Sequence, residues 1–181
     1  PDSVTNIGDY AFENCTSLES VIIGNGVTSI DSDAFSGCSS IKLFSVSANN
    51  NNYSSALGVL FNKDKTTLIC YPCGKIGGYT IPEGVTGIGE SAFFDCSSLT
   101  SITISESVTS IGDSAFSECR SLTSITIPES VTSIGENAFY GCSSLTSVSI
   151  SGASSIGGKA FYGCVALNSI TLSKSVLQIG S

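Results

Sequence analysis

Three consecutive segments of the chain read SLTSITISESVTSIGDSAFSEC (98–119), SLTSITIPESVTSIGENAFYGC (121–142) and SLTSVSISGASSIGGKAFYGC (144–164). They are copies of one unit with small changes, and each begins 23 residues after the one before it. Self-similarity at a period of this length indicates a protein built from stacked supersecondary units. What one unit buries, and how its copies stack, therefore decides the fold.

The unit recurs along the whole chain of 181 residues. The last apolar residue of its L-x-x-I-x-I segment, which we call the main strand, recurs every 22 or 23 residues except across one unit of 35 residues. We therefore expect one solenoid domain, 1–181. Its units are 1–23, 24–46, 47–81, 82–104, 105–127, 128–150 and 151–172, with a partial unit at 173–181. Because the chain starts with Pro instead of Met, we also expect it to be a fragment of a longer protein.

One unit has room for two short strands and a turn. In segment 122–127 the side chains of Leu122, Ile125 and Ile127 point inward, and β-branched residues favour an extended backbone. A second extended piece covers 131–134, and 136–140 suits a short helical or 3₁₀ turn. A single unit cannot bury its apolar face, but stacked copies share a continuous core. The expected fold class is mostly β, a solenoid of parallel-stacked coils with short helical or 3₁₀ turns.

The motif C-x-x-L-x-x-I-x-I-P-x-x-V-x-x-I-x-x-x-A-F resembles the BspA-like class of leucine-rich repeats, which occurs in surface proteins of host-associated bacteria and some parasitic protists. The longer unit, with NNNNYSSALGVLFNKDKTTLICYPCGK followed by YTIP, resembles an irregular repeat of the same family. The resemblance implies a right-handed, curved leucine-rich-repeat solenoid that is secreted or lies at the cell surface. It also implies a role in attachment or protein recognition, but no particular ligand.

Composition argues against several functions. The net charge is −8, from 7 basic and 15 acidic residues, and the basic residues are scattered, so we expect no nucleic-acid partner. No apolar run approaches the roughly 18 residues of a membrane span, so we expect no direct membrane insertion. The chain has no His, and its many Ser residues occupy repeated scaffold positions. We therefore expect no enzyme activity and no cofactor.

Acidic residues recur in two rows of the repeat. One row starts the turn (Asp9, Glu90, Asp113, Glu136) and the other follows the main strand (Glu83, Glu106, Glu129). Stacked carboxylates could bind Ca²⁺, or they could cap and solubilise an exposed edge. The rows are interrupted at Asn25, Gly152 and Lys174, which favours the second interpretation, and no metal site is expected.

Seven of the eight cysteines share one position, three residues before the main strand. They are Cys15, Cys38, Cys73, Cys96, Cys119, Cys142 and Cys164. We expect a structural ladder of buried free thiols, because parallel side chains do not easily reach the torsion of a disulfide. Zinc is disfavoured because no His completes a ligand set. Cys70 takes the place of a core Phe, and its C-x-x-C pairing with Cys73 precedes a strand instead of a helix, which disfavours a redox dithiol.

Candidate partner-binding residues come from three places. They are the outward hydroxyls Thr103, Thr126, Ser149 and Thr171 of the main strands, the amino-terminal positions Glu19, Ile22, Lys42 and Leu43, and Tyr53 and Lys63 in the long unit. Leucine-rich solenoids commonly bind with a concave face made by the main strands. Segments 57–61 and 66–69 of the long unit predict a β-hairpin, which could bind a partner or only bend the rod.

Four aromatic residues follow the core Phe position by one residue. They are Tyr71, Phe94, Tyr140 and Tyr162. They could anchor a partner from the turn side, or they could cover the outer edge of the core, which is the favoured interpretation.

Two functions remain open from sequence alone. The first is a non-enzymatic recognition or adhesion module that contacts a protein of a host or neighbouring cell. The alternative is a structural spacer or self-assembling subunit that stacks end to end through uncapped ends, because an open solenoid end presents unpaired strands.

Overall fold

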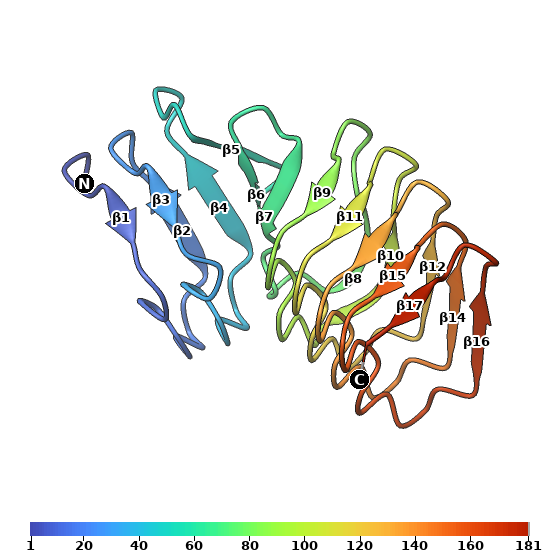
Figure 1. Cartoon of the computed structure of the whole chain (residues 1–181). Coiled ribbons are helices and arrows are strands. Elements are labelled where there is room, and N and C mark those ends of the chain that lie inside the picture. Colours follow the sequence, from blue (N-terminus) through green and yellow to red (C-terminus); the bar gives the residue numbers. More distant parts are fainter. Residues whose placement is uncertain (181) are drawn as a thin grey trace.

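A computed structural model describes residues 1–180 as a stack of coils, each with a main strand, a short second strand and a run of turns (Figure 1). The main strands are β2 (Ser20–Ile23), β4 (Leu43–Val46), β8 (Gly77–Thr80), β10 (Leu99–Thr103), β12 (Ser124–Ile127), β14 (Ser147–Ile150) and β16 (Ser169–Leu172). The second strands are β1 (Asn6–Ile7), β3 (Ser29–Ile30), β9 (Gly87–Ile88), β11 (Ser110–Ile111), β13 (Ser133–Ile134), β15 (Ser155–Ile156) and β17 (Gln178–Ile179). The predicted β solenoid of parallel coils is confirmed.

Neighbouring coils pair in parallel and in the register of the repeat. Strands β12, β14 and β16 form one sheet, and Ser124 lies beside Ser147, which lies beside Ser169. The second strands from β9 to β17 continue a sheet of eight strands. From β9 to β17 the coils approach closely after each second strand, where a Cβ on Gly135 would lie 2.5 Å from the main-chain nitrogen of Asp113. Glycine at this position is therefore required by the stacking of the coils.

The turns after the second strands are not helical, and residues 1–180 contain no helix, so the expected short helices are wrong. In the coil of residues 128–150, Phe139 and Gly141 donate their N–H groups to carbonyls of the next coil, at 2.8 Å in both cases. Only alternate residues, such as Tyr140, bond three residues back within the same turn. Asn137 and Gly141 adopt left-handed backbone conformations, with φ of 53° and 69°. Stacking between coils therefore takes the N–H groups that a helix would use.

A column of stacked aromatic rings runs through the core. Phe93, Phe116 and Phe139 are fully buried, with ring centroids 4.8 and 5.2 Å apart. In the long unit the ring of Tyr71 continues the column, with its centroid 4.9 Å from that of Phe93. The N–H of Tyr71 donates to the carbonyl of Ala92, just as the N–H of Phe93 donates to the carbonyl of Ala115 in the next coil. The prediction that Cys70 replaces a core Phe is therefore wrong by one residue. Tyr71, only 3% exposed, is also not an outward aromatic.

The long unit contains a three-stranded antiparallel insertion, of which the sequence predicted two strands. Its strands are β5 (Tyr53–Ala56), β6 (Val59–Asn62) and β7 (Thr67–Cys70), and β7 joins the eight-stranded sheet beside β9. Strand β6 separates two apolar cores, because Leu60 packs in the amino-terminal core while Val59 and Phe61 pack in the carboxy-terminal one. All three side chains are at most 1% exposed. The insertion is thus part of the scaffold.

Asn50 joins this insertion to the preceding coil. Its side-chain amide donates to the carbonyls of Gly24 and Val27 at 2.7 and 2.9 Å, and its side-chain oxygen accepts from the N–H groups of Asn52 and Tyr53, both at 2.8 Å. The residue is completely buried. Four hydrogen bonds on one buried side chain fix the direction in which the chain enters the insertion.

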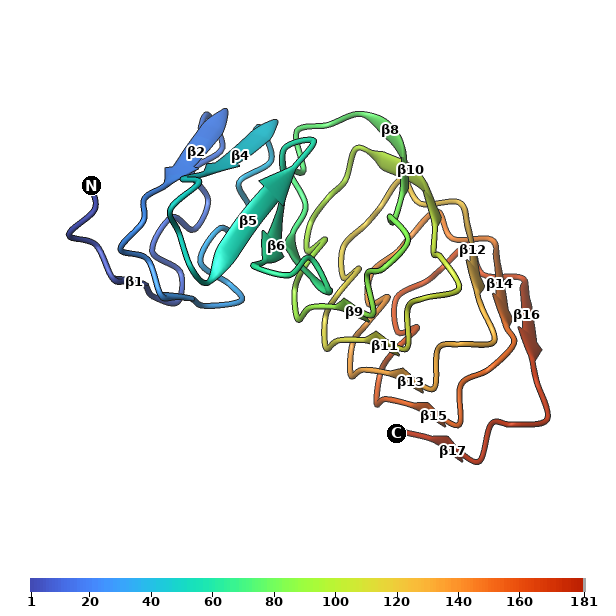
Figure 2. The ribbon, with the colours of Figure 1, turned by 90° about the horizontal axis from the view of Figure 1, so that it is seen from above.

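The stack bends at the insertion (Figure 2). The eight-stranded sheet lies along the inner side of the bend, and the main strands from β8 to β16 lie along the outer side. The expectation that the main strands form a concave face is therefore wrong for this part of the chain. Spreading the main strands on the outer side also provides space between neighbouring coils.

Candidate interaction surface

Four thiols of the cysteine ladder lie buried beside the aromatic column and donate hydrogen bonds to backbone carbonyls. The thiols of Cys119, Cys142 and Cys164 each donate to the carbonyl of the column Phe in the preceding coil, at 3.1 Å. Cys38 does the same with Phe12 at 3.0 Å. These four side chains are buried as predicted. A small side chain with a weak donor therefore satisfies a carbonyl at each coil contact.

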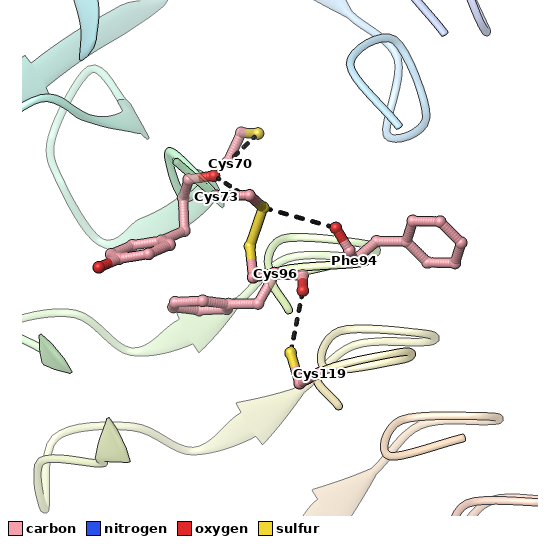
Figure 3. Close-up of a disulfide and its surroundings, with 7 residues drawn as sticks. Cys70, Cys73, Phe94, Cys96 and Cys119 are labelled. Atoms are coloured by element: carbon pink, nitrogen blue, oxygen red, sulfur yellow. Dashed lines mark hydrogen bonds between the residues drawn. A yellow bond between two sulfur atoms is a disulfide. The ribbon is translucent and has the colours of Figure 1, made fainter. Parts of the chain in front are cut away.

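Two members of the ladder are not free thiols. Cys73 and Cys96 form a disulfide, with their Cα atoms 4.4 Å apart (Figure 3). Cys73 follows its column aromatic, Tyr71, by two residues, whereas the other ladder cysteines follow theirs by three. Because of this shift of one residue, Cys73 does not have the repeat position, counted from the column aromatic, that Cys96 and the other ladder cysteines share. The expectation of free thiols is wrong at this pair, and burial is wrong for Cys15, which is exposed.

Thiol titration is expected to resolve the six free cysteines into classes. Cys15 should react at once with a disulfide reagent under native conditions, because reaction requires an accessible thiolate. Cys70 should react slowly at neutral pH, because burial raises its pKa to about 12. The four buried ladder thiols should react only in denaturant. In denaturant, six reactive thiols before reduction and eight after reduction would confirm the disulfide. Eight reactive thiols before reduction would contradict it.

Two rows of hydroxyl side chains, similar in sequence, have different surroundings. On the second-strand side, Thr109 and Thr132 donate to the carbonyl of the same position one coil earlier, at 3.0 and 3.2 Å, and Ser154 continues the series at 3.1 Å. On the main strands, the candidate residues Thr126, Ser149 and Thr171 lie side by side in the paired strands β12, β14 and β16. Within residues 1–180 the structure records no side-chain hydrogen bond for these three hydroxyls, so they remain available to a partner.

We call the outward surface of β8, β10, β12, β14 and β16 the main-strand face. An open groove of about 490 Å³ lies on this face, between β10 and β12. Its floor is Ile102 and Ile125, which are nearly buried. Hydroxyl side chains of β10 and β12 line it, including the predicted Thr103 and Thr126. Glu106 and Glu129 lie at one end. The structure thus brings two of the predicted residues together in one hollow.

The four amino-terminal candidates gather on a separate patch over β2 and β4. Lys42 and Glu19 form an exposed ion pair at 3.1 Å. Ile22 and Leu43 share the outward face and are 82% and 46% exposed. The insertion lies between this patch and the groove in the chain, and β4 is not paired with β8. The two groups of candidates are therefore separate surfaces.

The two candidates in the insertion contact the scaffold. Tyr53 packs against the amino-terminal core, and this burial raises the pKa of its hydroxyl. The ammonium of Lys63 donates to the carbonyl of Asn50. Both side chains therefore have structural contacts that a partner would have to share or displace.

The outward aromatics are fewer than predicted. Tyr140 and Tyr162 stack at 5.2 Å on the turn side, and Tyr162 is 61% exposed. Phe94 is half-buried at the same repeat position two coils before Tyr140, whereas Tyr71 belongs to the core. Neither Tyr140 nor Tyr162 is among the residues of 1–180 packed against the core, so both interpretations of this pair remain predictions.

Repeated coils, paired main strands and inward Leu and Ile positions define a leucine-rich-repeat solenoid. Residues 1–62 and 67–181 match the model of the BspA type leucine rich repeat region, with six copies. The chain belongs to this family, as the sequence predicted. Within residues 1–180, no helix is long and apolar enough to cross a membrane.

Three solved structures resemble the chain over most of its length. A leucine-rich repeat protein from Eubacterium ventriosum is 31% identical over 100% of the chain, with a TM-score of 0.81. A leucine-rich cell surface protein from Faecalibacterium prausnitzii is 34% identical over 97%, with a TM-score of 0.72. The pneumococcal vaccine antigen PcpA is 29% identical over 90%, with a TM-score of 0.83. These relatives are bacterial, and one is described as a surface protein.

The chain spans only part of these relatives. It covers 62% of the Eubacterium protein, 53% of the Faecalibacterium protein and 42% of the pneumococcal antigen. A search of curated proteins finds no match to the chain. The family and the fold are therefore shared with these relatives, while partners and activity are a matter for proposal.

Proposed function

We propose that the chain is a non-enzymatic recognition module, secreted or at the cell surface, that binds a protein of a host or neighbouring cell through its main-strand face. The observation that carries this proposal is the contrast between the two hydroxyl rows. The hydroxyls of Thr109 and Thr132 donate to backbone carbonyls, whereas those of Thr126 and Ser149 point outward and make no side-chain hydrogen bond within residues 1–180. Similarity to a cell surface protein of Faecalibacterium supports the location.

The test is capture of surface proteins on the immobilised chain, compared among three single variants. Thr126→Lys places a long cation on the main-strand face, Leu57→Lys alters the tip of the insertion, and Tyr162→Lys alters the turn side. Thr126 is exposed, and Leu57 and Tyr162 are 86% and 61% exposed, so none of the three substitutions disturbs the core. Deleting the insertion is not a usable test, because the deletion would remove the buried strand β6.

Loss of the captured protein with Thr126→Lys alone is the expected result. Loss with Leu57→Lys or Tyr162→Lys alone would place binding on the insertion or the turns and would contradict the proposal. End-to-end self-association is the competing proposal, and sedimentation over a range of concentrations distinguishes it. A chain that stays monomeric while it captures a partner favours recognition.

A further inference from the structure

The groove on the main-strand face coincides with a break in the sheet. Strand β10 pairs with β8, and β12 pairs with β14, but no strand pairing joins β10 to β12. Figure 2 shows a wider separation between β10 and β12 than between β12 and β14. In a parallel sheet, alternate residues of a strand direct their N–H and C=O groups toward opposite neighbours. Two strand edges therefore face each other across the groove.

Main-chain hydrogen bonds identify the groups on each edge. The carbonyl of Thr103 accepts from Ile81 and so faces β8, which leaves Ile102 and Ile104 facing β12. The carbonyl of Ile127 accepts from Ser151 and so faces β14, which leaves Thr126 facing β10. The main-chain groups that line the groove are thus of the kind that normally hold a neighbouring strand.

Pro128 removes one hydrogen bond that would join the two edges. After the next two main strands, Ser151 and Ser173 donate their N–H groups to Ile127 and Ile150 of the preceding coil, at 3.1 and 2.9 Å. Pro128 occupies the corresponding position after β12 and has no N–H group to donate. The equivalent bond to the carbonyl of Ile104 therefore cannot form. The pairing of β10 with β8 also has a register irregularity between Leu99 and Ser101.

The charge of the groove indicates what would occupy it. Glu106 and Glu129 are exposed at one end of the groove, and no Lys or Arg lines it. The ion pairs within residues 1–180 are Glu19 with Lys42 and Glu118 with Arg120, so neither groove carboxylate is neutralised. A cation would find two carboxylates on adjacent coils, whereas a polyanion would be repelled.

We propose that the groove between β10 and β12 binds an extended basic segment of a partner protein, which lies on the main-strand face over the two strand edges and places a Lys or Arg side chain between Glu106 and Glu129. This inference rests on the proposed function and gives the recognised partner a chemistry. Strand edges recognise extended backbone of any sequence, and the carboxylates add a requirement for positive charge. The hydroxyls of Thr103 and Thr126 offer further hydrogen bonds to the segment.

The charge requirement is tested with four blocked peptides, Ac-Val-X-Val-Thr-Val-NH₂, in which X is Arg, Lys, citrulline or Glu. Binding is measured by titration calorimetry and by amide chemical shifts of the full chain. We expect the Arg and Lys peptides to bind, the citrulline peptide to bind more weakly and the Glu peptide not to bind. The double variant Glu106→Gln/Glu129→Gln should weaken the Arg peptide by about five- to tenfold. Glu83→Gln, at the same turn position outside the groove, should have no effect.

The open sheet is tested with Pro128→Ser. Serine supplies the missing N–H group, as Ser151 does one coil later, so the bond to Ile104 can form and the two edges can pair. We expect Pro128→Ser to keep the solenoid fold, checked by circular dichroism, and to bind the Arg peptide at least about tenfold more weakly. The matched control is Pro82→Ser, which makes the same change after β8, outside the groove.

Three results would overturn the inference. They are no binding of any basic peptide at millimolar concentration, equal binding of the Arg and citrulline peptides, and unchanged binding to a well-folded Pro128→Ser variant. Failure of the proposed function would look different, because the chain would then capture no surface protein on its main-strand face whatever the peptides do. Capture that is lost with Thr126→Lys but retained by Pro128→Ser and the double glutamate variant would overturn the groove alone.

Discussion

Replacing Phe116 with Ala is expected to lower the free energy of unfolding by about 3–5 kcal/mol, which is typical of a fully buried Phe truncated to Ala. Phe116 has no exposed surface, and its ring stacks on both Phe93 and Phe139, at 4.8 and 5.2 Å. Because each coil contacts only its neighbours, the loss would be concentrated at the two contacts of this coil. Urea denaturation followed by circular dichroism measures it.

Tyr162→Ala is the matched control, because it removes an aromatic ring that is 61% exposed. Its effect should stay within about 0.5 kcal/mol, as for most surface substitutions. An equal loss of unfolding free energy in the two variants would contradict a stabilising role of the aromatic column.

Replacing Asn50 with Ala is expected to cost about 3 kcal/mol or more, since each buried group left without a partner costs about 1–3 kcal/mol. The substitution removes the partners of two carbonyls, on Gly24 and Val27, and of two N–H groups, on Asn52 and Tyr53. It should also loosen the insertion relative to the preceding coil, visible as faster amide hydrogen exchange in β5.

The chain supplies a close control for this prediction in the same run of asparagines. Asn51 is exposed, so Asn51→Ala changes the same side chain one residue away without removing a buried hydrogen bond. Its stability should equal that of the native chain within about 0.5 kcal/mol. If the two variants unfolded at the same urea concentration, the anchoring role of Asn50 would be wrong.

The repeat itself was readable from sequence, because burial follows the apolar positions in the inner coils. Leu122, Ile125 and Ile127 were predicted to point inward, and they are at most 3% exposed. The expected helical turns were wrong because sequence patterns within one coil do not reveal that alternate N–H groups are used by the next coil. Hydrogen bonding between coils is a property of the stack.

The long unit was where repeat register failed. Counting back from Cys73 placed Cys70 in the aromatic column, whereas the structure places Tyr71 there. A better signal was available in chemistry, since an aromatic ring fits a stack of Phe side chains better than a thiol does. The same shift accompanies the disulfide with Cys96, which an unbroken register argued against.

Candidate binding residues could be identified only as a class. Thr126 and Thr132 have similar sequence surroundings, yet one is exposed on the main strand and the other donates to the carbonyl of Thr109. The break between β10 and β12 had a visible signal in Pro128, which lacks the N–H group that the coil contact uses. Its meaning requires the position of the neighbouring strand, which sequence alone does not supply.

Recognition through the main-strand face is tested by hydrogen–deuterium exchange of the full chain with and without its captured protein partner. We expect protection of the amides in 101–106 and 124–127 and of Glu129, where the two strand edges and their acidic turns would contact the partner. Exchange at the insertion tip near Leu57 and in the turn containing Tyr162 should stay unchanged. Protection confined to the tip or the turns, with none on β10 and β12, would contradict recognition through the main-strand face.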